Sequence, residues 1–321
     1  MRARRNISLT VLRVLAFTAT VVAMSAQPYG YVSNEMSNTV SVVNRATNTV
    51  CDTISVSGAG LTGLVVTPGG SYIYVAEQSE NSVAVISTAS RSVVATIPVG
   101  SAPVQVAITP NGASVYVANS GSNNVSVINT ATNTVVATVP VGTRPTGIAV
   151  TLDGSEVLVA DAMASTISVI NTQTNSGWGT WWTRSGPTRI ALGPGGGAAY
   201  VTNQFANTVT VHRIFDGAMM HTITGFSTPS SVAVTPNGRY LYVTNGTSAS
   251  VAVVDTSSLE IVATVPTGPL PTSVAISPDG ARAYVTNGFG YSLSVINTAD
   301  NTVISTLSNV GSLPAAVALS N

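Results

Sequence analysis

A tetrapeptide of the type Tyr-Val-x-Asn recurs seven times along the 321-residue chain at nearly constant spacing. Five of the intervals are 42 residues long and one is 43 residues long. The copies lie at residues 31–34, 74–77, 116–119, 158–161, 200–203, 242–245 and 284–287. A unit repeated at such a period cannot bury its apolar faces alone and must pack against its neighbours. The repeat therefore predicts a stacked or radial architecture.

Residues 271–311 illustrate the content of one repeat. Its four short β segments are 271–277, 283–287, 293–297 and 302–307. A Ser-Pro-Asp-Gly turn at 277–280 places Pro and Gly where tight turns favour them. No amphipathic helical period of useful length occurs after residue 26. Four antiparallel strands in each of seven repeats predict an all-β, seven-bladed β-propeller.

The two ends of the repeat region predict how the ring closes. The repeats begin at a second strand, residues 31–34, and finish with residues 314–320, which have the sequence of a first strand without a blade after it. Unpaired strand edges promote aggregation. We therefore expect the C-terminal strand to pair with the N-terminal blade, so that residues 27–321 form a single propeller domain.

Residues 1–26 resemble a secretory signal peptide. Arg2, Arg4 and Arg5 precede a mostly apolar stretch at 14–22, and the small residues at 23–26 suit a signal peptidase. The apolar stretch is shorter than the roughly 20 residues that a membrane-spanning helix needs. We expect removal of this segment, no transmembrane segment afterwards, and a periplasmic, cell-surface or secreted protein.

The charge of the mature chain argues against nucleic acid as a partner. Removal of residues 1–26 leaves eight arginines against twelve acidic residues, and the sequence has no lysine. Sequence-independent nucleic-acid binding requires a basic face, which this composition does not provide. The lone cysteine, Cys51, is expected to be a small buried hydrophobic side chain rather than a nucleophile.

The tetrapeptides, the Thr/Ser-Pro-Asp-Gly turns and strands such as Ser-Val-Ile-Asn at 126–129 and 168–171 resemble YVTN-type β-propeller repeats. Those repeats occur in archaeal surface-layer proteins and in exported bacterial YncE-like proteins. The resemblance covers essentially the whole mature chain. It implies an extracytoplasmic propeller used mainly for binding or surface association, without a shared set of catalytic residues.

Acidic and histidine residues offer weak candidates for chemistry. Glu35, Glu77, Glu80 and Asp161 fall in the bends between second and third strands, where they form either solvated loop charges or an acidic rim with a weak calcium site. The two histidines, His212 and His221, lie in outer strands without converging ligands. We therefore expect no metal, no cofactor and no catalytic residues.

The inner strands carry the sharpest positional signal. Two residues after the position that opens each inner strand stand Gly63, Gln105, Gly147, Arg189, Ser231, Ser273 and Ala316. Side chains near a propeller axis are crowded, which accounts for the small residues. Gln105 and Arg189 are the exceptions that project polar groups toward the channel mouth. Arg144 and Arg184 lie in adjacent loops that lead into inner strands. With Arg189 they form either a cationic mouth for a small anionic ligand or independent solvated arginines.

Trp178, Trp181 and Trp182 stand on a fourth, outermost strand. They are either an apolar edge for a protein or glycan partner or rings packed between neighbouring blades. Taken together, the sequence favours a monomeric, exported, non-catalytic propeller that serves as a binding or surface-interaction module. The alternatives are a lactonase-like small-molecule hydrolase and an architectural surface-layer component.

Overall fold

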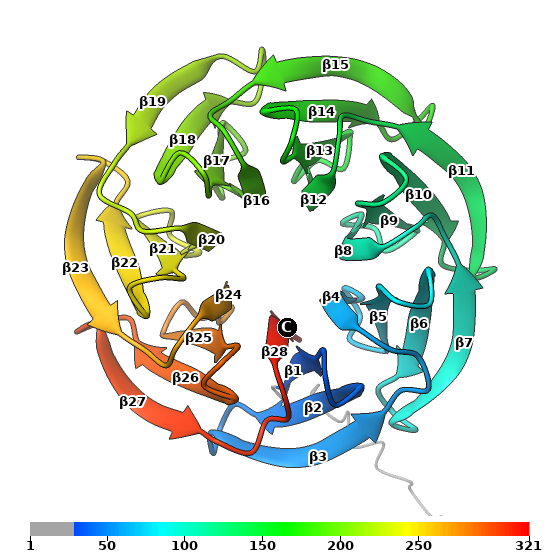
Figure 1. Cartoon of the computed structure of the whole chain (residues 1–321), viewed down its shortest axis with the longest axis horizontal. Coiled ribbons are helices and arrows are strands. Elements are labelled where there is room, and N and C mark those ends of the chain that lie inside the picture. Colours follow the sequence, from blue (N-terminus) through cyan, green and yellow to red (C-terminus); the bar gives the residue numbers. More distant parts are fainter. Residues whose placement is uncertain (1–28, 321) are drawn as a thin grey trace, which may run out of the picture.

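The computed structural model describes residues 29–320, which form seven four-stranded antiparallel sheets arranged as blades around a central axis (Figure 1). The prediction of an all-β, seven-bladed propeller is confirmed. Residues 29–320 contain no helix, and therefore none with the length and hydropathy of a membrane span. The expected signal peptide, residues 1–26, lies outside the described residues.

Each blade has an inner, a second, a third and an outer strand. The inner strands are β4 (Leu61–Val66), β8 (Pro103–Ile108), β12 (Pro145–Val150), β16 (Pro187–Leu192), β20 (Pro229–Val234), β24 (Pro271–Ile276) and β28 (Pro314–Leu319). The second strands are β1 (Tyr29–Asn34), β5 (Tyr72–Glu77), β9 (Ser114–Asn119), β13 (Glu156–Asp161), β17 (Ala198–Asn203), β21 (Tyr240–Asn245) and β25 (Arg282–Asn287).

The third strands are β2 (Thr39–Asn44), β6 (Ser82–Ser87), β10 (Asn124–Asn129), β14 (Thr166–Asn171), β18 (Thr208–Arg213), β22 (Ser250–Asp255) and β26 (Ser292–Asn297). The outer strands are β3 (Thr49–Ser55), β7 (Ser92–Pro98), β11 (Thr134–Pro140), β15 (Ser176–Trp182), β19 (Met219–Ile223), β23 (Glu260–Pro266) and β27 (Thr302–Leu307). Blade one is β28-β1-β2-β3, and blades two to seven follow in chain order.

Blade one closes the ring as the sequence predicts. The C-terminal strand β28 pairs antiparallel with β1, with Gly30 opposite Leu319 and Val32 opposite Val317. The backbone N–H of Ser320 also donates to the carbonyl oxygen of Tyr29 at 2.9 Å. One blade is therefore built from both ends of the described chain (Figure 1).

Apolar side chains fill the spaces between neighbouring blades. Tyr74 of blade two, for example, packs in one buried cluster with Val115 and Ile128 of blade three. Second and third strands are buried on both faces, so they have nearly continuous runs of Val, Ile and Tyr. Outer strands alternate between exposed and half-buried residues because successive side chains point to opposite faces of the sheet, of which one is more open to solvent. The core is thus distributed around the ring between the sheets.

The tyrosine of the repeated tetrapeptide ties each of three blades to the next one. Its hydroxyl donates to the side-chain oxygen of an asparagine 59 residues later, in the turn between the third and outer strands of the following blade. The pairs are Tyr74–Asn133 at 2.8 Å, Tyr116–Asn175 at 2.7 Å and Tyr242–Asn301 at 2.6 Å. Asn133 has φ of +52°, a conformation that asparagine tolerates better than most residues. We call this pair the Tyr–Asn clasp.

The asparagine that ends the tetrapeptide is a structural residue. Asn287 is buried and donates from Nδ2 to Ser292 Oγ at 3.1 Å and to Ser294 Oγ at 2.9 Å. Asn119 bonds Ser126 in the same way, and Gly100 of the loop leading into β8 lies against its amide. The repeated motif therefore maintains the blades, which is why the repeat defines the fold without defining a function.

Cys51 is exposed, so the prediction of a buried thiol is wrong. In the pairing of β2 with β3, Val42 lies opposite Asp52 and Val43 opposite Val50, which leaves Cys51 as the extra residue of a β-bulge. The burial of β3 nevertheless alternates from Thr49 to Ser55, and Cys51 falls on the exposed side of that alternation. The general preference of free cysteines for buried sites does not apply on this outer strand. Cys51 Sγ instead reaches the carbonyl oxygen of Val42 at 3.4 Å.

Candidate functional site

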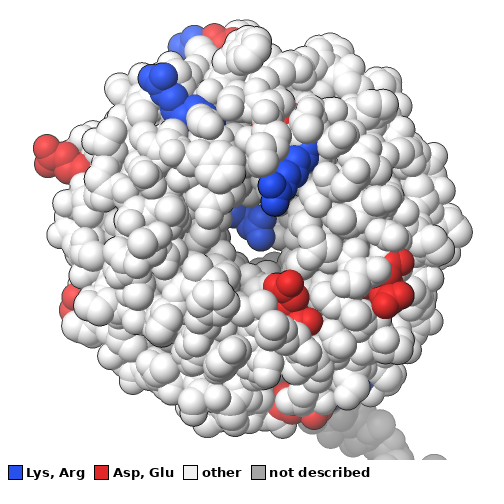
Figure 2. Space-filling model, viewed as in Figure 1, with Lys and Arg blue, Asp and Glu red and all other residues white. Residues whose placement is uncertain are grey.

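A cavity of about 390 Å³ opens at one mouth of the central channel. Its walls are the beginnings of several inner strands and the bends that follow second strands. Figure 2 shows the central opening with basic side chains on one side and acidic side chains on the opposite side, in a face that otherwise carries little charge. Arg189 and Glu35 both line this cavity, which we call the axial pocket.

Arg189 supplies the positive charge of the axial pocket. Its Nη1 donates to the carbonyl oxygen of Thr146 at 2.8 Å and to that of Thr188 at 3.4 Å. The ion pairs formed within residues 29–320 are Arg91–Asp52, Arg213–Asp216 and Arg239–Asp255, so Arg189 belongs to none of them. Burial lowers the pKa of Arg189 to about 10, which still leaves it protonated at neutral pH. A poorly solvated cation without a counter-ion favours an anionic or strongly polar ligand.

Two inner strands carry a long side chain, Gln105 or Arg189, and a glycine in the preceding blade makes room for each of them. A Cβ on Gly147 would lie 2.5 Å from the carbonyl oxygen of Thr188 and 2.9 Å from Arg189 Cα. A Cβ on Gly63 would lie 2.2 Å from Gln105 Oε1. Small and large residues thus alternate from Gly63 to Arg189, whereas Ser231, Ser273 and Ala316 are all small. Gln105 lies against Gly63, and its Oε1 has no hydrogen-bond partner among residues 29–320.

Glu35 supplies the acidic group of the axial pocket. It directly follows β1, and its backbone N–H donates to the carbonyl oxygen of Leu313 at 3.0 Å, which fixes the bend against the loop leading into β28. Burial raises the pKa of the Glu35 carboxyl above its ordinary value. A carboxylate of raised basicity beside a cavity that admits water is suited to accept a proton from it.

Arg144 and Arg184 lie outside the axial pocket. Both are exposed in the loops that lead into β12 and β16, and neither lines the cavity. Arg144 has φ of +57°, and its backbone N–H donates to Asn123 Oδ1 at 2.8 Å. Of the three arginines that the sequence suggested for a cationic mouth, the structure brings only Arg189 into the pocket.

Large apolar side chains on one bend and on two loops that lead into inner strands surround part of the axial pocket. Phe289, Leu270 and Leu313 line it, and Phe289 is 64% exposed. The same bend position carries Met36, Met163 and Phe205 in other blades, all of them exposed. Sequence analysis missed this apolar rim. The sequence does contain a signal for it. The position two residues after the last residue of the tetrapeptide is large and apolar in four blades, but small or polar in the other three, which carry Ser79, Gly121 and Thr247.

Two of the four bend carboxylates are buried, so the expectation that they are solvated is wrong for Glu77 and Asp161. Asp161 takes the place of the motif asparagine and accepts hydrogen bonds from Ser168 N–H, Ser168 Oγ and Thr166 Oγ1 at 3.1, 2.7 and 3.2 Å. Burial outweighs these bonds and raises the pKa of Asp161 to about 6. No group of three or more His, Cys, Asp or Glu side chains within residues 29–320 is arranged to hold a metal ion.

His212 is buried at the outer side of blade five, and His221 is exposed on β19. His212 Nδ1 donates to the carbonyl oxygen of Gly217 at 3.2 Å, and Nε2 accepts from Thr210 Oγ1 at 3.1 Å. Burial lowers the pKa of His212, which keeps the ring neutral. The ring of Trp181 stacks on it, with centroids 6.2 Å apart.

For the three tryptophans the sequence left two alternatives, an exposed apolar edge or rings packed between blades, and the residues divide between them. Trp181 packs against His212 and Gly217, whereas Trp178 and Trp182 are 70% and 77% exposed. Trp178 is the extra residue of the β-bulge between β14 and β15, in the place that Cys51 occupies in blade one. Trp178 is thus exposed on the same side of the alternation as Trp182.

Comparison with known proteins places the chain among the propellers. The family model for lactonase, 7-bladed beta-propeller, matches residues 13–136 and 182–318. The unmatched interval includes strands β12 to β14 and most of β15 of blade four. A search of curated proteins gave no match.

Several solved structures share the fold at low sequence identity. A protein of unknown function from Desulfotomaculum acetoxidans is 17% identical with a TM-score of 0.83, covering 91% of this chain and 99% of its own. A candidate 6-phosphogluconolactonase from Bacteroides uniformis is 18% identical with a TM-score of 0.79 and coverages of 91% and 99%. The hydrazine synthase of Kuenenia stuttgartiensis is 22% identical with a TM-score of 0.57 and coverages of 77% and 97%.

At these identities the solved structures support the fold alone. The family model is the stronger finding, because its match extends over most of the sequence and over six of the seven blades. The chain therefore belongs to the lactonase, seven-bladed β-propeller family.

Proposed function

We propose that the chain hydrolyses a small lactone in the axial pocket. The observation that carries this proposal is the presence, in one cavity of about 390 Å³, of an arginine outside every ion pair of residues 29–320 and a carboxyl group with a raised pKa. The family membership supports the same activity. Hydrolysis is one of the two alternatives that the sequence leaves open, and the presence of Arg189 and Glu35 in the axial pocket supports it.

In this proposal Arg189 binds the carbonyl oxygen of the lactone and stabilises the negative charge that develops on it. Glu35 takes a proton from a water molecule, and the oxygen of that water forms a bond with the carbonyl carbon. The ring C–O bond then breaks, and the leaving alkoxide takes the proton from Glu35. The product is the open hydroxy acid, and Glu35 returns to its ionised form.

The charge of the axial pocket favours an unphosphorylated substrate. Two of the structural neighbours are named as candidate 6-phosphogluconolactonases, whose substrate would carry a phosphate group. Here Arg189 and Glu35 contribute opposite charges, and no second cation of residues 29–320 lines the pocket. A phosphate dianion would therefore lack a second positive partner. The apolar rim of Phe289, Leu270 and Leu313 instead suits an uncharged ring or a short alkyl chain.

Hydrolysis of glucono-δ-lactone and of short alkyl δ-lactones tests the proposal, with acid release followed by a pH indicator and the spontaneous rate subtracted. We expect Glu35→Gln to lower kcat by about 10²- to 10⁴-fold, the usual contribution of a general base. Arg189→Gln should lower it by about 10²- to 10³-fold. Arg239→Gln, in the turn between β20 and β21 of blade six, is the matched control. If Glu35→Gln and the unaltered chain hydrolyse the lactones with the same kcat, the proposal is wrong.

Binding without turnover is the second candidate function. It is favoured because Glu35 is the one acid–base group of Asp, Glu or His type that lines the described axial pocket. In that case gluconate would bind in calorimetry with an affinity that depends on Arg189, while the lactone would hydrolyse at its spontaneous rate. The partner classes for such a module remain a protein, a glycan or a small anionic ligand.

We also propose that the repeats are of the YVTN type and that the mature, monomeric protein acts outside the cytoplasm. The basic, apolar and small segments within residues 1–26 support export. Mass spectrometry of the N-terminus after expression in a bacterial host tests this, since cleavage after Ser25 or Ala26 is the expected result. An intact N-terminus on the protein recovered from the cytoplasm would contradict it.

A further inference from the structure

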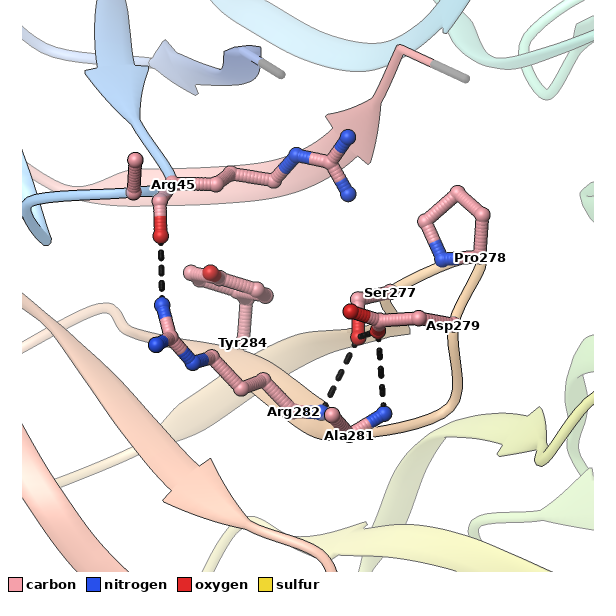
Figure 3. Close-up of a pocket in the computed structure, with 8 residues that line it drawn as sticks. Arg45, Ser277, Pro278, Asp279, Ala281, Arg282 and Tyr284 are labelled. Atoms are coloured by element: carbon pink, nitrogen blue, oxygen red, sulfur yellow. Dashed lines mark hydrogen bonds between the residues drawn. The ribbon is translucent and has the colours of Figure 1, made fainter.

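A second cavity, of about 360 Å³, lies where blade seven meets blade one. It is lined by the turn that joins β24 to β25, by Arg282 and Tyr284 of β25, and by Arg45 directly after β2 (Figure 3). These turns lie at the opposite strand ends from the axial pocket, so the cavity opens on the other face of the disc. We call it the seam pocket, because the two blades that it joins hold the beginning and the end of the described chain.

Tyr284 shows that the seam pocket differs from the three blade junctions where a Tyr–Asn clasp forms. In the Tyr–Asn clasps the tyrosine hydroxyl donates to an asparagine of the next blade. At the seam the corresponding asparagine is Asn48, but its Oδ1 accepts from Arg282 Nη1 at 3.1 Å. The Tyr284 hydroxyl, in a side chain only 1% exposed, therefore has no hydrogen-bond partner among residues 29–320. A buried donor without an acceptor is costly and favours a ligand that supplies one.

Arg45 contributes a second unpartnered donor. Its Nη2 donates to the carbonyl oxygen of Ser320 at 2.7 Å, which holds the guanidinium beside the end of β28. Its Nε is buried and has no acceptor within the described residues. Figure 3 shows Tyr284 between Arg45 and Arg282. Tyr284 Oη and Arg45 Nε thus offer two free N–H or O–H donors in the same pocket.

The charges around the seam pocket select a singly charged ligand. Arg45 and Arg282 contribute two positive charges, and Asp279 contributes one negative charge on the wall formed by the β24–β25 turn. Ser277 Oγ and the backbone N–H of Ala281, the latter at 3.0 Å, both donate to Asp279 Oδ1, so Oδ2 remains able to accept a further bond. The net charge of the wall is +1, which matches a carboxylate better than a phosphate dianion.

We propose that the seam pocket binds a small hydroxy monocarboxylate. Its carboxylate accepts hydrogen bonds from Arg45 Nε and Tyr284 Oη, and a hydroxyl group donates to Asp279. The volume of about 360 Å³ lies within the range of small-molecule sites and accommodates a sugar acid. The ligand contacts blades one and seven together and thereby stabilises ring closure. This site is separate from the axial pocket and does not depend on the proposed hydrolysis.

Calorimetric titration with gluconate tests the proposal in an Arg189→Gln background, which removes the charge of the axial pocket. We expect one binding event, which Tyr284→Phe weakens by about tenfold through the loss of one hydrogen bond to a charged group. Arg45→Gln should abolish it. Gluconate should also raise the unfolding temperature of the Arg189→Gln protein, because it binds the closed ring.

Tyr116→Phe is the matched control, since that hydroxyl already donates to Asn175. Tyr116→Phe should lower the unfolding temperature without changing gluconate affinity, whereas Tyr284→Phe should change affinity without lowering the unfolding temperature of the ligand-free protein. No gluconate binding in the Arg189→Gln protein, or equal affinity in Tyr284→Phe, would overturn the proposal. Lactone hydrolysis by the unaltered chain is measured independently, so the two proposals fail separately.

Discussion

Arg189 of blade five donates a hydrogen bond from Nη1 to the carbonyl oxygen of Thr146 in blade four, at a distance of 2.8 Å. The neighbouring residue Gly147 permits this approach, because a Cβ there would meet the backbone of blade five. The position of the guanidinium in the axial pocket therefore depends on a glycine in a different blade. A side chain at residue 147 would force the two inner strands apart.

Gly147→Ala should lower the free energy of unfolding by about 1–3 kcal/mol, the usual cost of overpacking a tightly packed site. Urea denaturation measures this change. Gly179→Ala on the outer strand β15 is the control, because a Cβ there meets nothing within 4 Å. Equal stability of the two variants would show that blades four and five adjust to the added methyl group without cost.

Asp161→Asn should stabilise the protein at neutral pH. The folded pKa of Asp161, about 6, lies above the ordinary value of 3.8, so the folded state binds the proton more tightly than the unfolded state does. The stability of the unaltered chain therefore rises as pH falls from about 6 toward 3.8. Above pH 6 the free energy of unfolding of Asp161→Asn should exceed that of the unaltered chain by about 3 kcal/mol. This difference should disappear as the pH falls from about 6 to 3.8.

Chemical denaturation of both proteins between pH 4 and pH 8 checks this linkage, and the opposite substitution, Asn119→Asp, should introduce a similar pH dependence into blade three. A stability difference that stays constant with pH would show that Asp161 remains ionised throughout.

The kcat/KM for lactone hydrolysis should fall on the acid side as Glu35 becomes protonated. Burial raises the pKa of Glu35 above 4.5, so the fall begins at a higher pH than for a solvated glutamate. A pH–rate profile corrected for spontaneous hydrolysis measures the effect. The acid limb should be missing from the residual activity of Glu35→Gln, and its persistence there would assign the titration to another group.

The three tryptophans should differ in their contribution to stability. Trp181→Ala should cost about 2–4 kcal/mol, because it empties a half-buried site against His212 and Gly217. Trp178→Ala and Trp182→Ala should each change stability by less than about 0.5 kcal/mol, since both rings face solvent. Urea denaturation compares the variants, and acrylamide should quench the fluorescence of Trp178 and Trp182 more strongly than that of Trp181.

The blade number and the closure of the ring were predictable because the determining signals are local. The turns at residues such as 277–280 and the β-branched runs recur at a fixed period, and the incomplete repeats at the two ends complement one another. The place of Arg189 followed from the same register. Its partners did not, because the approach to Thr146 depends on how closely blade four packs against blade five.

Contacts between blades and irregular pairing account for what the sequence did not predict. The Tyr–Asn clasp joins residues 59 positions apart, such as Tyr116 and Asn175, so one repeat examined alone does not contain it. Cys51 and Trp178 are the extra residues of bulges in the pairing of third with outer strands, which the sequence of one strand does not reveal. Glu77 and Asp161 resembled loop charges, but they replace a buried asparagine and share its environment.

The pairing of β28 with β1 has a consequence for the order of folding. Tyr29 and Ser320 are 291 residues apart, so β1 leaves the ribosome long before β28 can cover its inner edge. Joining such distant segments costs chain entropy and slows folding. Loss of the last few residues would therefore remove a channel-lining strand and leave blade one with an open edge, through which two nascent chains could pair.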